Sequence, residues 1–363
     1  MKIFFTIFIF CLVLFIYLHI QFHIKTSNDL EIYELDQSSK DKLEEICDIR
    51  QPVIFDFDNE KIIDNTNKDT ILYNYKAFDI KIRNINDHNF DSEIYMPIPL
   101  HAANKLFADD KNSAFFSENN QDFLQETGVI KSFQYNDEFL RPYMVSNCNY
   151  DVMMGSADLA TPFRYELNYR NYFVITQGSV QIKLSPPCST KYLNLVYDYE
   201  NFEFRSPMNP WKIQPQYIAD FDKIKCLDVT LIKGQTIQIP AYWWYSIKFT
   251  KDSSISCFRY RTYMNNAAIS PHIFMYALQL QNVKHDSVKK HDISALNKGI
   301  NKKNKKEYKK EYKEGDEKRD REEYEKEEYE KEDSEDKKED DIEETIKVDD
   351  KEDNSTPISA LPN

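Results

Sequence analysis

The chain has 363 residues and a formal net charge of −14 at pH 7. The segment 302–353 holds 16 Lys and Arg against 25 Asp and Glu, so it carries −9 of that charge and the remaining residues carry only −5. This balance excludes a domain-wide basic face, and we expect no nucleic-acid partner. The six cysteines are widely spaced and form no C-x-x-C pair, which argues against a zinc site or a disulfide framework.

The N-terminus is a long apolar segment. From Ile3 to Phe22 the chain has no charged residue, and about 20 residues at ~1.5 Å each cover the ~30 Å hydrocarbon core of a bilayer. We therefore predict that residues 1–25 form a single-pass membrane anchor. A cleaved signal peptide is the alternative, although 19–25 offer no small-residue cleavage site. The Lys-, Asn-, Ile- and Tyr-rich composition suggests an AT-rich viral or protist genome, and hence a host or endoplasmic-reticulum-type membrane.

The segment that follows the anchor, 26–49, is an acidic lead-in with a helical pattern. Its stretch 38–49 places the apolar residues on one face at helical spacing. A first strand is predicted at 52–57. The region 60–130 mixes short apolar runs with Asn- and Asp-rich turns, and within it 115–124 has the pattern of a loop that leads into a helix.

Short strand-like segments separated by turn signals dominate the next part of the chain. They are 172–176, 180–184, 228–240, 246–250 and 255–261. Gly178 lies between the first two, which predicts a hairpin turn there. Many short strands of this kind favour an antiparallel sandwich or barrel. We expect a helix at 269–283, within a flanking segment 266–290, to pack on its outside.

The C-terminal region, 291–363, is a charged low-complexity tail. Its basic block, 302–313, includes Tyr308 and Tyr312, and 314–344 is mostly Glu, Lys and Asp. Such a segment lacks the apolar residues that a core requires, which predicts disorder or a solvated single helix. One hypothesis for the whole chain is an anchored scaffold that binds a protein partner through this tail.

Two short motifs carry the strongest functional signal. They read Thr161-Pro-Phe-Arg-Tyr-Glu166 and Pro240-Ala-Tyr-Trp-Trp-Tyr245. Both resemble the metal-binding segments of the cupin-like JmjC family of Fe(II)/2-oxoglutarate oxygenases, which read T-P-x-H-x-D and P-x-x-W-W-H. The resemblance implies a mainly β protein, with a double-stranded β-helix (a cupin/JmjC-like jelly roll) over residues 50–265 and flanking helices around it.

Two longer stretches extend the same resemblance. Residues 171–187 match the family pattern N-x-F-x-x-x-x-G-x-K-x-x-x-L-x-P-P, with Val180 where the pattern has its lysine. Residues 231–244 match L-x-x-G-D-x-x-x-I-P-x-x-W-W, with Gln235 for the aspartate. Agreement of two distant segments in order and in character supports the fold.

The three positions that correspond to the metal ligands carry unsuitable side chains. A non-haem Fe(II) oxygenase needs two imidazoles and one carboxylate, and here the positions hold Arg164, Glu166 and Tyr245. Arginine has no lone pair to give, and a tyrosine with a pKa near ~10 is a costly ligand. The i, i+2 spacing of Arg164 and Glu166 directs both into the barrel. We therefore expect no metal, no Fe(II) and no 2-oxoglutarate.

The expected cosubstrate pocket is also altered. Val180 replaces the family's 2-oxoglutarate-binding lysine, Lys183 lies on the opposite face of the strand, and Thr161 is retained. None of the seven histidines begins an H-x-D or H-x-E motif. Histidines such as His88 and His101 are therefore not expected to replace the missing ligands.

Two interpretations of the altered site remain open. In the first, Arg164, Glu166 and Tyr245 form an internal ion pair and hydrogen-bond group that fills the former metal site. In the second, Arg164 forms an anion pocket together with Arg259 or Arg261. The leading hypothesis is thus a membrane-anchored pseudoenzyme with a binding or structural role, which contacts a protein partner through its barrel or tail. The alternative is a protein hydroxylase that uses Fe(II) and 2-oxoglutarate at an atypical centre.

Overall fold

The computed structural model describes residues 2–285 except 37–38, 58 and 86–94. The predicted tail, 291–363, and His88 lie outside these described residues.

The first element is a long apolar helix, α1 (Lys2–Ile24). The mean hydropathy of its most apolar window is 2.7, and none of that window is buried. At ~1.5 Å per residue the helix is about 35 Å long, enough to cross a bilayer. A signal sequence near an N-terminus has the same length and composition, so the helix is either an anchor or a signal sequence.

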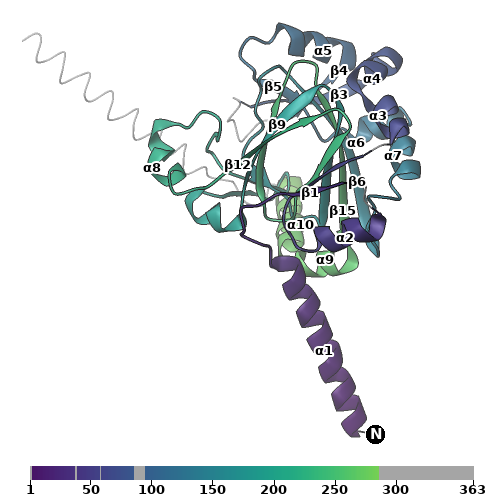
Figure 1. The fold of residues 1–363 in the computed structure, drawn as a ribbon, viewed down its shortest axis with the longest axis vertical. Helices are drawn as coiled ribbons and strands as arrows, with labels where there is room; N and C mark the ends of the chain where they lie inside the picture. Colours follow the sequence, from purple (N-terminus) through teal and green to yellow (C-terminus); the bar gives the residue numbers. More distant parts are fainter. Residues whose placement is uncertain (1, 37–38, 58, 86–94, 286–363) are drawn as a thin grey trace, which may run out of the picture. The chain divides into compact units, whose positions relative to one another are not determined.

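Helices pack on the outside of one sheet. The predicted helix at 38–49 is present as α2 (Lys40–Cys47), and its N-cap Ser39 accepts a hydrogen bond from the Lys42 backbone, as N-terminal caps commonly do. In the region 60–130 the sequence predicted short apolar runs, turns and the start of a helix after 115–124. Its described residues form α3 (Glu60–Thr66), α4 (Lys68–Tyr75), α5 (Leu100–Asp109) and α6 (Gln121–Glu126), and α7 (Ile130–Asn136) follows. These helices lie along one side of the strands in Figure 1.

The larger sheet has nine strands in the order β1-β2-β13-β8-β15-β6-β5-β3-β4. All neighbouring pairs are antiparallel except β1 and β2, which are parallel. Its strands are β1 (Tyr33–Leu35), β2 (Val53–Asp56), β3 (Asp79–Asn84), β4 (Tyr95–Pro99), β5 (Phe115–Ser117), β6 (Val145–Gly155), β8 (Arg170–Gln177), β13 (Gln235–Gln238) and β15 (Ser254–Thr262).

The smaller sheet has six strands in the order β10-β11-β7-β14-β9-β12, all antiparallel. Its strands are β7 (Arg164–Tyr165), β9 (Ser179–Ser185), β10 (Val196–Asp198), β11 (Glu203–Arg205), β12 (Leu227–Ile232) and β14 (Trp244–Phe249). Three short helical segments connect them: η1 (Pro187–Tyr192), η2 (Pro215–Tyr217) and α8 (Ile218–Phe221). The strands predicted between 172 and 261 are all present.

The turn at Gly178 connects the two sheets. β8 belongs to the larger sheet and β9 to the smaller one, so the predicted hairpin at Gly178 is wrong.

The turn at Gly234 likewise leads from β12 to β13 in the other sheet, and the Lys233 amide donates to the Gly178 carbonyl at 3.1 Å. Both glycines have positive φ, 69° and 90°, a conformation that favours glycine. A Cβ on Gly178 would also lie 3.0 Å from the Ser253 backbone. These turns close one end of the two-sheet sandwich.

Apolar side chains fill the space between the sheets. Alternate residues of β8 point to opposite faces: Tyr172 and Val174 join the cluster under the helices, whereas Phe173 and Ile175 join the cluster between the sheets. Trp243 belongs to the inner cluster as well. The continuous burial of β8 follows from this two-sided packing.

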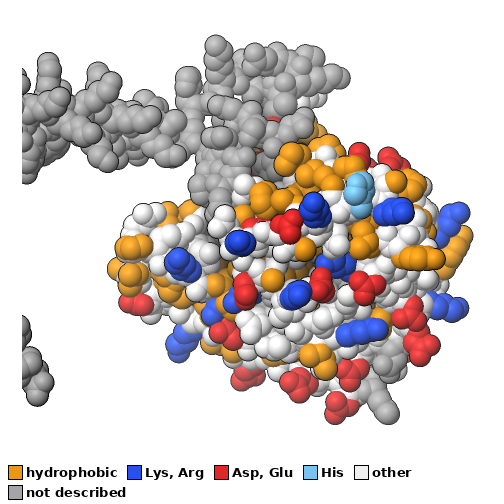
Figure 2. All heavy atoms as spheres, turned by 90° about the horizontal axis from the view of Figure 1, so that it is seen from above, with side chains coloured by type: hydrophobic (Ala, Val, Ile, Leu, Met, Phe, Trp, Pro, Cys, Tyr) orange, Lys and Arg blue, Asp and Glu red, His pale blue; other side chains and the backbone are white. Residues whose placement is uncertain are grey.

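Two helices follow the last strand, α9 (Tyr263–Ala268) and α10 (Ser270–His285). They correspond to the helix predicted at 269–283, preceded by one additional short helix. α9 lies beside the C-terminal end of α1 (Figure 1). The ring of His23, in α1, lies 3.3 Å from the hydroxyl of Thr262, the N-cap residue of α9. Seen from the end opposite α1, the surface carries Lys and Arg interspersed with Asp and Glu (Figure 2).

Candidate functional site

Arg164 and Tyr245 lie opposite each other on neighbouring strands of the smaller sheet. β7 contributes Arg164, β14 contributes Tyr245, and the two residues are register partners. The Arg164 guanidinium carbon lies 5.8 Å from the centre of the Tyr245 ring. Both side chains are buried. The structure thus brings the two sequence motifs together at one point.

Arg164 binds two carboxylates that lie outside both motifs. Its Nη1 donates to Glu118 Oε1 at 3.0 Å and to Glu203 Oε1 at 2.9 Å, and its Nη2 donates to Glu118 Oε2. Glu118 directly follows β5, and Glu203 is the first residue of β11. The prediction of an ion pair between Arg164 and Glu166 is therefore wrong, because the Arg164 guanidinium pairs with Glu118 and Glu203 instead.

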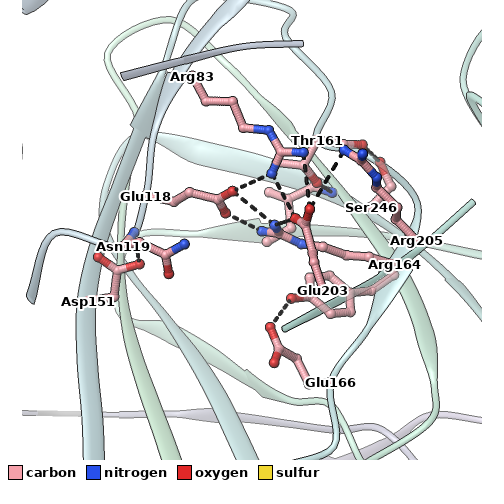
Figure 3. Close-up of polar contacts among 12 residues, drawn as sticks. Arg83, Glu118, Asn119, Asp151, Thr161, Arg164, Glu166, Glu203, Arg205 and Ser246 are labelled. Atoms are coloured by element: carbon pink, nitrogen blue, oxygen red, sulfur yellow. Dashed lines mark hydrogen bonds and ion pairs between the residues drawn. The ribbon is translucent and has the colours of Figure 1, made fainter. Parts of the chain in front are cut away.

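A second arginine joins the same two carboxylates. Arg83 donates to both oxygens of Glu203, at 2.7 and 3.1 Å, and to Glu118 Oε1 at 3.1 Å. The Tyr95 hydroxyl also donates to Glu118, at 2.9 Å. Figure 3 shows Arg83 and Arg164 converging on the two glutamates, with Arg205 Nη1 3.7 Å from Glu203 Oε2. We call Arg83, Glu118, Arg164 and Glu203 the central network.

Electrostatics keeps the central network ionised. Burial by itself would raise the pKa of Glu118, but Arg164 and Arg83 outweigh it and lower that pKa to about 2. The pKa of Glu203 is lowered for the same reason, against burial, chiefly by Arg83 and Arg164. Although burial opposes it, Glu118 raises the pKa of Arg164 further above its ordinary value. At neutral pH the central network therefore consists of two cations and two anions.

Glu166 belongs to a neighbouring group. Its Oε1 accepts from the Tyr245 hydroxyl at 3.1 Å, and its Oε2 accepts from the Asn168 amide at 3.2 Å. Arg259 Nε lies 3.6 Å from Glu166 Oε1. Burial, followed by the charge of Glu166, raises the pKa of Tyr245 well above its ordinary value. Tyr245 is therefore a neutral hydrogen-bond donor at physiological pH.

The two predicted cosubstrate positions face different surroundings. The Thr161 hydroxyl accepts from the Ile247 amide at 2.9 Å, and the Thr161 carbonyl accepts from the Ser246 hydroxyl at 2.7 Å. Thr161 thus secures β14. Val180 is fully buried in the cluster between the sheets, whereas Lys183 forms an ion pair with Asp228.

The two other predicted arginines differ in how they are paired. Arg259 is 7% exposed and lies 3.6 Å from both Asp151 and Glu166. Its Nε has no hydrogen-bond partner among the described residues. Arg261 donates from Nε to Asn168 Oδ1 at 2.6 Å, and its guanidinium lies 5.1 Å from the centre of the Phe202 ring.

A cavity of about 350 Å³ opens beside the central network. Most of its lining residues are polar, and they come from both sheets and from α10. The lining residues are Tyr95, Glu118, Asn119, Asn147, Asn149, Arg164, Glu166, Asn168, Asn201, Phe202, Glu203, Arg259, Arg261, Ile273 and Tyr276. Arg164, Glu166, Arg259 and Arg261 all reach this cavity, whereas Tyr245, Thr161 and Val180 are not among its lining residues.

These side chains do not fit the Fe(II) site of the oxygenases. Arg164 offers no lone pair, and its positive charge repels a divalent ion. Tyr245 retains its proton, which leaves Glu166 as the one suitable ligand among the three positions. Within the part of the chain that the structure describes, no three His, Cys, Asp or Glu side chains are arranged to hold a metal ion.

Three members of the central network were not identified from the sequence: Arg83, Glu118 and Glu203. Arg83 alternates with the apolar Ile80 and Ile82 in β3, a pattern that predicts a solvent-facing side chain, whereas in the structure Arg83 is buried. Glu118 and Glu203 lie in short segments with no distinctive pattern. Asp151, which faces Arg259, was missed as well, within the unpredicted strand β6.

Comparison with known protein families agrees with the fold. The model of the cupin-like domain family matches residues 43–260. The chain therefore belongs to the cupin-like domain family, as the resemblance of its motifs predicted. A search of curated proteins found no significant match.

Proposed function

We propose that this chain is a membrane-anchored cupin-like protein that has lost Fe(II)- and 2-oxoglutarate-dependent catalysis and acts by binding a ligand or partner. One observation carries the proposal: the Arg164 guanidinium occupies a position that requires an imidazole, and Glu118 and Glu203 hold it there. If Arg164 moved aside for a metal ion, the two buried carboxylates would lose one of their cations and would have to share Arg83.

Two further positions support the loss of this chemistry. Tyr245 is a buried, protonated phenol where the family has an imidazole. Val180 is buried and apolar where the family has the lysine that binds 2-oxoglutarate. A site that lacks two metal ligands and the cosubstrate cation has no route to oxygen activation.

Contacts at the end of α1 support an uncleaved anchor. His23 is buried and contacts Thr262, and the Arg50 guanidinium carbon lies 4.4 Å from the centre of the Phe22 ring. The Thr26 hydroxyl donates to the Ala241 carbonyl at 3.2 Å. Cleavage near residue 25 would remove the first two contacts. A signal sequence that is cleaved off does not require such contacts with the folded domain.

The test of lost catalysis uses the detergent-solubilised full chain. We expect no Fe(II) binding at micromolar concentration under anaerobic conditions and no conversion of 2-oxoglutarate to succinate. A catalytically active oxygenase of the JmjC type, assayed in parallel, controls for the metal and cosubstrate. Turnover of 2-oxoglutarate that a chelator abolishes would contradict the proposal and favour an oxygenase with an atypical centre.

A further inference from the structure

The cavity beside the central network has one arginine that forms no ion pair among the described residues. Arg164 and Arg83 are matched by Glu118 and Glu203, and Arg259 lies between Asp151 and Glu166. Arg261, by contrast, has no carboxylate within 4 Å among the described residues; its partners are the Asn168 amide and the Phe202 ring.

The neighbours of Arg261 hold its guanidinium in place. Asn168 Oδ1 accepts from Nε at 2.6 Å, while the Asn168 amide nitrogen donates to Glu166 and to Asn171. These two donated bonds fix the orientation of the Asn168 side chain, so its oxygen is directed at Arg261. The two terminal nitrogens of Arg261 have no hydrogen-bond partner among the described residues. A planar pair of donors at the wall of a cavity is suited to an anion that binds in a bidentate manner.

Arg259 is a second arginine at the wall of this cavity. Its side chain is more than nine-tenths buried and lines the cavity, and its Nε lacks a hydrogen-bond partner among the described residues. This nitrogen is buried and lies 3.6 Å from Glu166 Oε1, so Arg259 contributes positive charge to the cavity wall.

The charge and lining of the cavity restrict the class of ligand. Arg261 lines the cavity without a carboxylate within 4 Å among the described residues, and Glu166 lines it too, so a monoanion at Arg261 meets less repulsion than a phosphate dianion. Neutral polar side chains of the wall suit hydroxyl groups of a ligand: Asn147, Asn149, Asn201 and Tyr276. A volume of about 350 Å³ lies at the lower end for small-molecule sites.

We propose that this cavity binds a small polyhydroxylated carboxylate, with Arg261 receiving the carboxylate and the asparagines receiving the hydroxyls. The inference rests on the proposed function, because it takes the barrel to bind a ligand without a metal ion. It assigns the unused hydrogen-bond donors of Arg261 to one ligand group.

The experiment is calorimetric titration of the full chain in detergent, in the presence of a chelator. The probes are glucuronate, gluconate and quinate, with glucose and sorbitol as neutral counterparts and inorganic phosphate as the competing anion. We expect at least one hydroxy carboxylate to bind, and neither its neutral counterpart nor phosphate to match it. Arg261→Gln should weaken that binding at least tenfold, and Arg261→Lys should weaken it less.

Controls separate the role of Arg261 from folding and from net charge. Lys223→Gln removes one positive charge at an exposed position outside the cavity and should leave binding unchanged. Thermal unfolding of each variant verifies that the barrel is intact. Failure of all three carboxylates, unchanged binding in Arg261→Gln, or tighter binding of phosphate or of an acidic peptide would overturn the inference.

Parallel Fe(II) titrations distinguish this inference from the proposed function. Carboxylate binding in chelator without Fe(II) binding supports both. Absence of both kinds of binding overturns only the carboxylate site, whereas carboxylate binding that requires Fe(II) contradicts both.

Discussion

Arg164 and Tyr245 are register partners on adjacent strands, yet they bind different carboxylates. Arg164 binds Glu118, whereas the Tyr245 hydroxyl donates to Glu166. The positions that correspond to the family's metal ligands are therefore divided between two groups: a buried network of two arginines and two glutamates, and a more open group around Glu166 that faces the cavity. We propose that the first stabilises the barrel and that the second binds a ligand, and the two roles are separately testable.

Removing Arg164 should be strongly destabilising. In Arg164→Met, Glu118 and Glu203 lose a cation while buried, and the free energy of unfolding should fall by about 3 to 5 kcal/mol. Lys81→Gln breaks an exposed ion pair with Asp122 and should cost at most about 1 kcal/mol. Urea unfolding followed by tryptophan fluorescence measures both. Equal effects of the two substitutions would show that the central network contributes no more than a surface ion pair.

The stability of the barrel should depend on pH through Glu118. Its folded-state pKa of about 2 lies below the ordinary value of 4.5, so its contribution is complete above pH 4.5 and is lost as the pH falls toward 2. The shift corresponds to on the order of 3 kcal/mol. Unfolding measured between pH 6 and pH 3 should show this decline in the native chain and in Asp122→Asn. The decline should be smaller in Glu118→Gln; an identical pH profile would refute the assignment.

Restoring the family's ligands should restore some metal affinity. The variant that combines Arg164→His, Glu166→Asp and Tyr245→His should bind Co(II), detected by its visible absorption, while each single substitution should not. One imidazole cannot complete a three-ligand site. Adding Val180→Lys should then be required for 2-oxoglutarate binding. Co(II) binding by the unmodified chain would count against a lost metal site.

The apolar helix α1 should hold the chain in membranes. We expect the full chain to sediment with membranes and to resist extraction at alkaline pH, because Ile3–Phe22 is long enough to span the bilayer. Deletion of residues 2–24 should release a soluble product. Recovery of a native protein whose N-terminus begins near residue 25 would instead identify α1 as a cleaved signal.

Arg50 should be replaceable by an apolar residue. Its side chain is buried between the Phe22 and Tyr169 rings, and none of its three nitrogens has a hydrogen-bond partner among the described residues. Burial, followed by the charge of Arg170, lowers the pKa of Arg50 to about 10. Arg50→Met should therefore leave the stability unchanged or raise it by up to about 2 kcal/mol.

Arg50→Lys controls for size while keeping the charge, and it should not be stabilising. Thermal unfolding in detergent and in vesicles of anionic lipid compares the variants. A loss of stability in Arg50→Met that occurs only in anionic vesicles would mean that a lipid headgroup pairs with Arg50.

Local features of the sequence were sufficient for much of the fold. Alternation of apolar residues located strands such as β9 and β14, because strand periodicity depends on neighbouring residues. The two motifs identified the cupin-like family. The turn at Gly178 was located as well. Its assignment to a hairpin was wrong, because whether a turn stays in one sheet or crosses to the other depends on how distant strands pair.

The partners of Arg164 were decided only by the tertiary structure. Its i, i+2 spacing with Glu166 is a local property and was visible in the sequence, but Glu118 and Glu203 are 46 and 39 residues away along the chain. Arg83 reaches Glu203 across 120 residues. Nothing in a short segment specifies such a pairing. It arises because β3, β5, β7 and β11 bring their charged side chains to one buried place, where each charge requires a counterion.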